Sequence, residues 1–266
     1  MATIVLDPGH SDWTYKFPNG YREGVLVRKT AIEAKKLLSS QGHNVLLTRE
    51  KPDENPPLSE RACLAVKNKA KIFVSIHTNA ITGIEQTHCS GVYGIFFANN
   101  PNDTFQPDNQ ILAPNGRRLA QLISQEISLL MGLPIYKNSN AGAMVWYRCP
   151  ANLGVLSACD NWSKTEAACL IEAGYADNPS DMSILSKEDA HIKYALGICR
   201  GIYRYAGWSI PRDWDIMENT NNNISNDIED AIKWLIENNI DNGDNIIGNY
   251  VLEKSAIWLK KFNDLI

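Results

Sequence analysis

The sequence predicts an α/β fold in which a sheet packs against helices. Short apolar and β-branched runs recur along the first two thirds of the chain, and segments with helical spacing lie between them. Strands that alternate with helices are typical of α/β sandwiches. Of the 266 residues, 44% are hydrophobic and 21% are charged, which is ordinary for a globular protein. The length suits one large domain, or a large and a small one.

Five runs are predicted to be strands, and the third and fifth are nearly all apolar, as buried strands tend to be. They are residues 4–6, 45–48, 72–76, 92–97 and 169–171. Residues 27–40 and 116–131 have the apolar spacing of amphipathic helices, and Gly42 supplies a stop signal for the first. Residues 99–114 are rich in Asn, Asp and Pro, which predicts a long surface loop that could border a substrate groove.

The cysteines are predicted to be free thiols made in a reducing compartment, because no C-x-x-C pair occurs and two of them lie in apolar runs. They are Cys63, Cys89, Cys149, Cys159, Cys169 and Cys199. The N-terminus begins with a strand and leaves no room for a signal segment. No apolar run approaches the roughly 20 residues of a membrane span. We therefore expect synthesis in the cytoplasm without a signal peptide, and no membrane partner.

The composition changes near Pro211, which predicts a domain boundary. Residues 213–266 contain 11 acidic residues and four lysines, a net charge of −7, whereas residues 1–212 carry a net charge of +3. We predict a large domain over residues 1–210 and, after an Asn-rich linker over residues 211–226, a small helical module.

The small module is predicted over residues 227–266, where two amphipathic patterns occur at residues 228–239 and 252–265. It faintly resembles the helix-turn-helix unit of S-layer-homology-like modules, which often attach to cell-wall polymers. Its negative charge argues against a nucleic-acid partner. Binding of a secondary wall polymer and self-association into a homo-oligomer remain equal alternatives.

Two histidines and two glutamates accompany the predicted strands. His10 closes L-D-P-G-H, His77 lies in S-I-H-T-N-A, and Glu172 follows the last apolar run in L-I-E-A-G-Y-A-D-N-P. Each motif alone has an ordinary explanation as a turn or a structural residue. Together, the two histidines are candidate metal ligands, because ligand sites of open α/β sheets gather at strand ends. With Glu23 they suit zinc, and three protein ligands leave a position for a reactive water. An unpaired carboxylate at Glu172 would be costly, which implies a function or a polar partner.

With these motifs and L-L-T-R, which ends in Arg49, the chain resembles the zinc-dependent N-acetylmuramoyl-L-alanine amidases of the amidase type 3 family. The motifs occur in the order expected for that family, and the resemblance spans roughly residues 2–206. The resemblance implies that His10, Glu23 and His77 bind Zn²⁺ and that Glu172 is the catalytic acid/base. It implies a mixed sheet of about six strands with helices on both faces. The implied reaction is zinc-assisted hydrolysis of the amide between the lactyl group of N-acetylmuramic acid and L-alanine in peptidoglycan.

The chain departs from the family between His10 and Glu23. The family usually has H-G-G-x-D-x-G followed by a Glu-Lys pair, whereas Gly24 follows Glu23 here. Asp12 is therefore an alternative oxygen ligand.

Four further residues are candidates for a supporting role. Asp7 and Asn79 would orient ligands or substrate, or else stabilise turns. Arg49 would bridge loops through an ion pair or meet an acidic group of the substrate. Trp13 would contact glycan or peptide, or else cover the edge of the core. The remaining histidines, His43, His88 and His191, are predicted to be surface groups rather than ligands.

An amidase without a signal peptide and with a small extra module resembles a bacteriophage endolysin of a Gram-positive host. Such an enzyme passes through holes made by a holin and acts at the cell wall. A host autolysin for mother-cell lysis is the alternative. From a different class, a non-catalytic peptidoglycan-binding protein is a further alternative, but it would not need the base Glu172.

Overall fold

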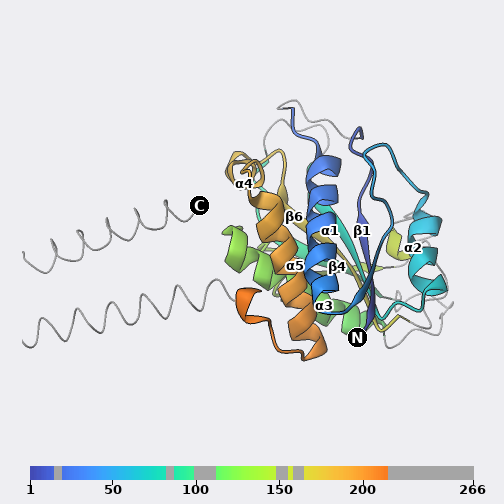
Figure 1. Ribbon diagram of the computed structural model, residues 1–266. Coiled ribbons are helices and arrows are strands. Elements are labelled where there is room, and N and C mark those ends of the chain that lie inside the picture. The colour runs from blue at the N-terminus through green and yellow to red at the C-terminus, as the bar shows by residue number, and fades with distance from the viewer. Residues whose placement is uncertain (15–19, 82–86, 99–111, 148–154, 158–164, 215–266) are drawn as a thin grey trace, which may run out of the picture. The chain divides into compact units, whose positions relative to one another are not determined.

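The computed structural model describes residues 1–14, 20–81, 87–98, 112–147, 155–157 and 165–214. They form a mixed six-stranded sheet in the order β2-β1-β3-β6-β4-β5, with helices on both faces (Figure 1), which confirms the predicted fold class. The strands are β1 (Thr3–Pro8), β2 (Asn44–Leu47), β3 (Ile72–Asn79), β4 (Val92–Ala98), β5 (Ala143–Tyr147) and β6 (Ala167–Tyr175). The helices are α1 (Glu23–Ser40), α2 (Leu58–Lys67), α3 (Leu112–Met131), α4 (Pro179–Leu185) and α5 (Ala190–Ala206), with 3-10 turns η1 (Val155–Ser157) and η2 (Arg212–Trp214).

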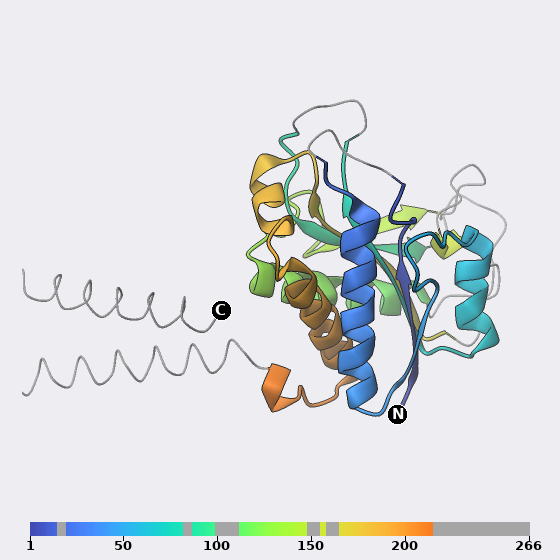
Figure 2. The same cartoon turned by 45° about the horizontal axis from the view of Figure 1, so that its top comes forward.

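The chain reverses its direction of progress across the sheet at β1. Strands β2, β1, β3 and β6 are parallel, whereas β4 runs antiparallel to β6. The chain passes from β1 through α1 to β2, which lies on one side of β1, and then through α2 to β3, which lies on the other side. The two connecting helices, α1 and α2, lie on opposite faces of the sheet (Figure 2). Ligand sites of open α/β sheets lie at the carboxyl ends of strands at such a switch point.

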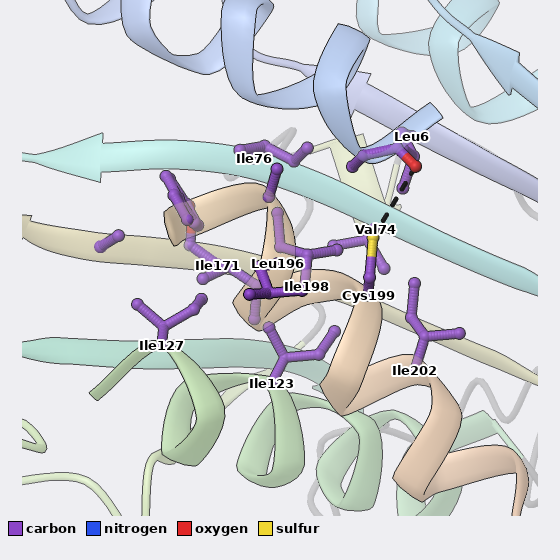
Figure 3. Packing of buried hydrophobic residues seen from close by; sticks show 14 of the residues in the cluster. Leu6, Val74, Ile76, Ile123, Ile127, Ile171, Leu196, Ile198, Cys199 and Ile202 are labelled. Carbon is purple, nitrogen blue, oxygen red and sulfur yellow. Dashed lines mark hydrogen bonds between the residues drawn. The ribbon is translucent and has the colours of Figure 1, made fainter. Parts of the chain in front are cut away.

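The larger core lies between the sheet and the layer of α1, α3 and α5 (Figure 3). Helices α3 and α5 pack closely because Gly197 and Gly201 face α3: a Cβ on Gly201 would lie 2.5 Å from the Cα of Ile123. The thiol of Cys199 donates to the carbonyl of Ala34 over 3.7 Å, which ties α5 to α1. The smaller core lies on the opposite face, under α2 and η1. That face is the one that carries the site described below.

Several element boundaries differ from the sequence-based prediction. Helix α1 begins at Glu23, four residues before the predicted start, because a carboxylate is favourable in the first turn of a helix. Strand β3 continues through His77 and Asn79 instead of ending before them, since backbone pairing with β6 extends to these residues. Glu172 likewise lies inside β6. The predicted loop over residues 99–114 is wrong in its last three residues, which open α3; Pro114 is tolerated there because the first turn lacks N–H partners.

Helices α2, α4 and α5 and strand β5 are not predicted from the sequence. Helix α5 is buried along most of its length and includes two glycines, Gly197 and Gly201, which are poor helix formers and weaken its local helix signal. Helix α4 has only seven residues, and its start depends on Asn178, whose side-chain oxygen accepts from the N–H groups of Ser180 and Asp181.

Among the described residues, Cys89, Cys169 and Cys199 are free thiols, as predicted, and the last two are buried. Cys149 and Cys159 lie outside the described residues. Within the part that the structure describes, each helix is too short or too polar to cross a membrane.

Residues 1–214 form one compact unit. Trp214 is 2% exposed, and its carbonyl accepts a hydrogen bond from Arg200 Nη1 at 2.9 Å, so the unit includes four residues beyond the predicted boundary at residue 210. Residues 215–266 are outside the described part. The linker and the small helical module therefore stay predictions.

Candidate metal centre and active site

His10, Glu23 and His77, which are far apart in the sequence, meet at the carboxyl ends of β1 and β3. His10 Nε2 lies 3.4 Å from Glu23 Oε2, and His77 Nδ1 lies 2.9 Å from Glu23 Oε1. One donor atom from each residue lies within 4.8 Å of the other two. No second group of three His, Cys, Asp or Glu side chains with this spacing occurs in the described ranges. The structure thus brings together all three residues that the sequence identifies as candidate ligands.

The separation of the His10 and Glu23 donor atoms matches that of two ligands on a tetrahedral metal ion. Zn–N and Zn–O bonds of 2.0–2.2 Å place neighbouring ligand atoms about 3.3–3.6 Å apart. The distance between His10 Nε2 and Glu23 Oε2 falls in this range. His77 Nδ1 and Glu23 Oε1 are closer because they form a hydrogen bond, in which the imidazole and the carboxylate share a proton. A metal ion would displace that proton. Two imidazoles and one carboxylate are, in addition, a donor set that suits zinc.

The protonation of the two imidazoles differs because their surroundings differ. Burial lowers the pKa of His10 to about 4, so its ring is neutral and ready to ligate at neutral pH. Burial also disfavours the charged form of His77, but the hydrogen bond and charge of Glu23 outweigh it and raise the pKa of His77 to about 9. The pKa of Glu23 is lowered, because the bond with His77 outweighs the cost of burying the carboxylate. Without a metal, a buried ion pair holds these two side chains.

The loop between β1 and His10 is shaped for close contact with His77. A Cβ on Gly9 would lie 2.1 Å from Cε1 of the His77 ring, so only glycine leaves room for this imidazole. His10 itself has a φ of 56°, in the left-handed region that non-glycine residues rarely adopt. Backbone strain of this kind is found at functional sites, where surrounding contacts enforce it.

Arg49 supplies part of those contacts. Its guanidinium, buried with the side chain at 2% exposure, donates to the carbonyls of Pro8 at 3.1 Å, Gly9 at 2.9 Å and Gly24 at 2.9 Å. These carbonyls flank His10 and Glu23, so one side chain ties the two ligand-bearing segments together. Arg49 therefore bridges loops inside the protein.

Asp12 is held by arginines and takes no part in the ligand group. Its carboxylate accepts from Arg28 Nη2 at 2.7 Å and pairs with Arg49 Nη1 at 3.0 Å. The structure places Asp12, the alternative oxygen ligand of the sequence analysis, in this ion-pair cluster.

A second buried arginine, Arg61 of α2, holds the same loop from the other side. It donates to Asp7 Oδ1 at 2.8 Å, to the carbonyl of Pro8 at 2.8 Å and to the carbonyl of His10 at 3.1 Å. Asp7 also accepts from the hydroxyls of Thr48 and Ser75 at 2.5 and 2.6 Å. Asp7 thus orients the loop that carries His10, through a partner that sequence reasoning missed. No sequence signal marks Arg61, because the residues of this loop that it binds lie 51–54 positions away.

Glu172 stands beside the ligand group on the same face of the sheet. In β6 it pairs with His77 of β3 on one side and with Tyr93 of β4 on the other. Its Oε2 is buried and has no hydrogen-bond partner among the described residues. Burial is the main cause that raises the pKa of Glu172 to about 8; the charge of His77 opposes the shift and that of Glu23 adds to it. A carboxyl group with an unpaired oxygen and a pKa near neutrality is suited to move protons.

Trp13 and Asn79 lie at the margins of this site. Trp13 is 64% exposed, and the guanidinium of Arg22 lies 5.3 Å from the centre of its ring, within cation–π range. Asn79 donates from Nδ2 to the hydroxyl of Tyr93 at 2.6 Å. His43, His88 and His191 do not join the ligand group; His43 is half-buried, and its ring stacks on that of Trp208 with ring centres 4.5 Å apart.

The motif A-D-N-P-S-D after Glu172 closes the end of β6. Asn178 donates to the carbonyls of Thr87 and Cys89. The fully buried Asp181 accepts from Ser90 Oγ at 2.6 Å, Gly91 N at 2.8 Å and Tyr175 N at 2.9 Å. Asp181 thereby joins the starts of α4 and β4 to the strand of Glu172.

Replacement of Asp181 should be costly for stability. Asp181→Ala leaves two buried N–H donors, those of Gly91 and Tyr175, without an acceptor, and each such group costs about 1–3 kcal/mol. We expect the free energy of unfolding, measured by urea denaturation, to fall by at least about 2 kcal/mol. Asp189→Ala is the matched control, because Asp189 makes a partly exposed ion pair with Lys193 worth about 1 kcal/mol or less. Equal losses in the two variants would contradict this role for Asp181.

Comparisons with known proteins agree with this geometry. A family model described as N-acetylmuramoyl-L-alanine amidase, Amidase_3, matches residues 4–204. The N-acetylmuramoyl-L-alanine amidase AmiC of Neisseria meningitidis serogroup B is 29% identical over 237 residues, which cover 78% of this chain and 53% of AmiC. The germination-specific N-acetylmuramoyl-L-alanine amidase of Bacillus subtilis is 24% identical over 221 residues, 76% of this chain and 78% of that protein. The chain thus spans only about half the length of AmiC.

A solved structure shows the same fold. The crystal structure of the N-acetylmuramyl-L-alanine amidase Ami1 from Mycobacterium smegmatis matches with a TM-score of 0.62 at 18% identity, over 77% of this chain and 97% of that one. The region that the family model matches, residues 4–204, contains all of the sheet except Thr3, and it contains the three candidate ligands.

Proposed function

Since the chain belongs to the Amidase_3 family of N-acetylmuramoyl-L-alanine amidases, we propose that it hydrolyses the amide between the lactyl group of N-acetylmuramic acid and L-alanine in peptidoglycan. The observation that carries this proposal is the unpaired carboxyl oxygen of Glu172, one strand away from three candidate metal ligands. Hydrolysis of a stable amide needs a group that accepts and donates a proton, and beside it a Lewis acid that polarises the carbonyl. A protein that only binds peptidoglycan needs neither.

His10, Glu23 and His77 are the residues that would hold zinc. Bound there, zinc supplies a Lewis acid that polarises the scissile carbonyl and makes water a better nucleophile at neutral pH. The chain contributes the positions of the ligands: Arg49 fixes the carbonyls that flank His10 and Glu23, and Gly9 leaves space for the ring of His77.

Glu172 moves the proton. As a carboxylate it accepts a proton from the water that attacks the lactyl carbonyl, and it then delivers this proton to the alanine nitrogen as the C–N bond breaks. The products are a lactyl carboxyl group and a free amino group on alanine. A raised pKa makes Glu172 a strong enough base for the first step, and positive charge at the neighbouring ligand group favours the carboxylate form that this step needs.

The products of wall digestion test the proposal. Purified Gram-positive cell walls should lose turbidity and release alanine amino groups without new reducing sugars. A chelator should stop the release, and returned zinc should restore it, because the reaction needs the Lewis acid. New reducing sugars would indicate a glycosidase. No lysis by the zinc-loaded protein would favour a wall-binding protein.

For the biological role we propose an endolysin of a bacteriophage with a Gram-positive host, released by a holin and active at the cell wall. The acidic segment over residues 227–266 would bind a secondary wall polymer or mediate self-association. An autolysin is the alternative role, since named relatives include a germination-specific amidase of Bacillus subtilis. Cosedimentation with walls extracted to remove secondary polymers tests the segment: equal binding to extracted and intact walls would contradict polymer recognition.

A further inference from the structure

Tyr93 lies on the opposite flank of Glu172 from the candidate metal ligands. In the β ladder, Glu172 is paired directly with His77 of β3 and with Tyr93 of β4. Residues that are directly opposite in neighbouring strands place their side chains on the same face of a sheet, about 5 Å apart. The face therefore carries, in order, the metal-ligand group, the acid/base Glu172 and the phenol of Tyr93.

Asn79 donates a hydrogen bond to the hydroxyl of Tyr93, and the direction of this bond is fixed. The backbone N–H of Ala80 donates to Asn79 Oδ1 at 2.7 Å, and because an N–H can only donate, this contact fixes which side-chain atom is the oxygen. The other atom, Nδ2, then donates to Tyr93 Oη at 2.6 Å. The Tyr93 oxygen is thus an acceptor toward Asn79, so its own proton must go to a different partner.

Two more tyrosines complete the surroundings of this hydroxyl. The ring of Tyr93 lies 5.0 Å from that of Tyr136 and 6.4 Å from that of Tyr175, so the three phenols form one cluster. Because Asn79 donates to the Tyr93 oxygen, the Tyr93 proton is left to donate to an acceptor on the face of Glu172. Burial, with the charge of Glu172, raises the pKa of Tyr93, so the phenol keeps its proton and remains a donor.

We propose that the Tyr93 hydroxyl donates a hydrogen bond to the first peptide carbonyl of the stem peptide, with Asn79 as its positioning residue. This proposal rests on the proposed amidase function. Glu172 delivers its proton to the alanine nitrogen, so the departing peptide extends from Glu172 away from the metal ligands. Tyr93 occupies that flank of Glu172. The alanyl carbonyl is the nearest strong acceptor beyond the nitrogen that leaves.

The assignment is tested by comparing the binding of two ligands, one that carries a peptide and one that does not. In a zinc-loaded Glu172→Ala protein, which cannot turn over, calorimetry would measure the affinity for N-acetylmuramoyl-L-alanyl-D-isoglutamine and for N-acetylmuramic acid. Adding Tyr93→Phe should weaken the first ligand by about 2- to 13-fold, the range for one neutral hydrogen bond, and leave the second unchanged. Equal weakening of both ligands, or of neither, would overturn the proposal. If neither ligand binds before Tyr93 is changed, the proposed amidase function fails instead.

Asn79→Asp tests the polarity without a change in shape. The introduced carboxylate can only accept, so it would draw the Tyr93 proton away from the peptide. We expect the same selective loss of affinity for the peptide-bearing ligand as with Tyr93→Phe, and no further loss when the two changes are combined. Additive losses would contradict a shared role. This variant also serves if Tyr93→Phe does not fold.

Tyr136→Phe is the matched control. It removes a hydroxyl from the same aromatic cluster, one that accepts from Asn138 Nδ2 at 3.1 Å and does not bond with Asn79. We expect its affinity for both ligands to equal that of the parent. A loss as large as that of Tyr93→Phe would mean that the cluster acts only as a structural unit and would overturn the assignment to Tyr93.

Discussion

Glu172→Gln should lower the turnover of cell walls by about 10²- to 10⁴-fold while the protein keeps its zinc, which is the usual effect of removing a general acid/base. The amide that replaces the carboxyl group has nearly the same shape, but it cannot accept the proton of the attacking water. The segments that carry His10 and Glu23 are held by Arg61 and Arg49, and His77 is hydrogen-bonded to Glu23, so replacing the Glu172 side chain should not move the ligands. Release of alanine amino groups measures the turnover, and elemental analysis measures the zinc.

Glu166→Gln is the matched control for this variant. Glu166 stands one residue before β6 and pairs with Lys71 at 3.0 Å in an exposed ion pair. Its replacement should leave both activity and zinc content unchanged. A Glu172→Gln protein with full activity would remove Glu172 from the mechanism, and one that had lost its zinc would show that Glu172 supports the metal site.

His77→Ala should abolish both zinc binding and turnover. It removes one of three donors, and it also leaves Glu23, 4% exposed, without the imidazole that shares its proton. An unpaired buried carboxylate takes up a proton or draws in water, and either change weakens it as a ligand. We expect zinc content to fall to background after gel filtration, and activity to fall further than in Glu172→Gln.

His88→Ala controls for the loss of a histidine, because His88 is exposed and does not belong to the ligand group. It should keep the zinc and activity of the parent. Retention of one zinc per chain by the His77→Ala protein would contradict the ligand assignment. Together with Glu172→Gln, this variant separates loss of the metal from loss of proton transfer.

The sequence predicts the parallel strands and the location of the site because both depend on local patterns. Apolar runs mark β1, β3 and β6; His10 follows the first of these strands, and His77 and Glu172 come directly after the apolar runs of the other two. The order of these motifs is also what identifies the family. Glu23 is harder to place, because its helix begins at the glutamate itself without a side-chain cap.

The groups that support the site could not be predicted, because they depend on contacts between distant segments. Arg61 meets Asp7 across 54 positions, and Asp181 meets Ser90 across 91. Tyr93 faces Glu172 only because β4 inserts antiparallel beside β6. No local spacing reports such pairings. The presence of zinc, the endolysin role and the small module after residue 214 stay predictions.

The hydrogen bonds of Arg49 and Arg61 bear on whether the protein folds before it binds a metal ion. Both guanidiniums hold the His10 loop through backbone carbonyls, and Arg49 also holds the carbonyl of Gly24. None of these bonds involves a donor atom of the metal group. Folding and metal acquisition should therefore be separate steps, in contrast to small zinc modules that fold only around their ion. If the protein uses zinc as proposed, a newly made chain would fold first as a stable but inactive molecule, and the local supply of zinc would decide when it becomes active.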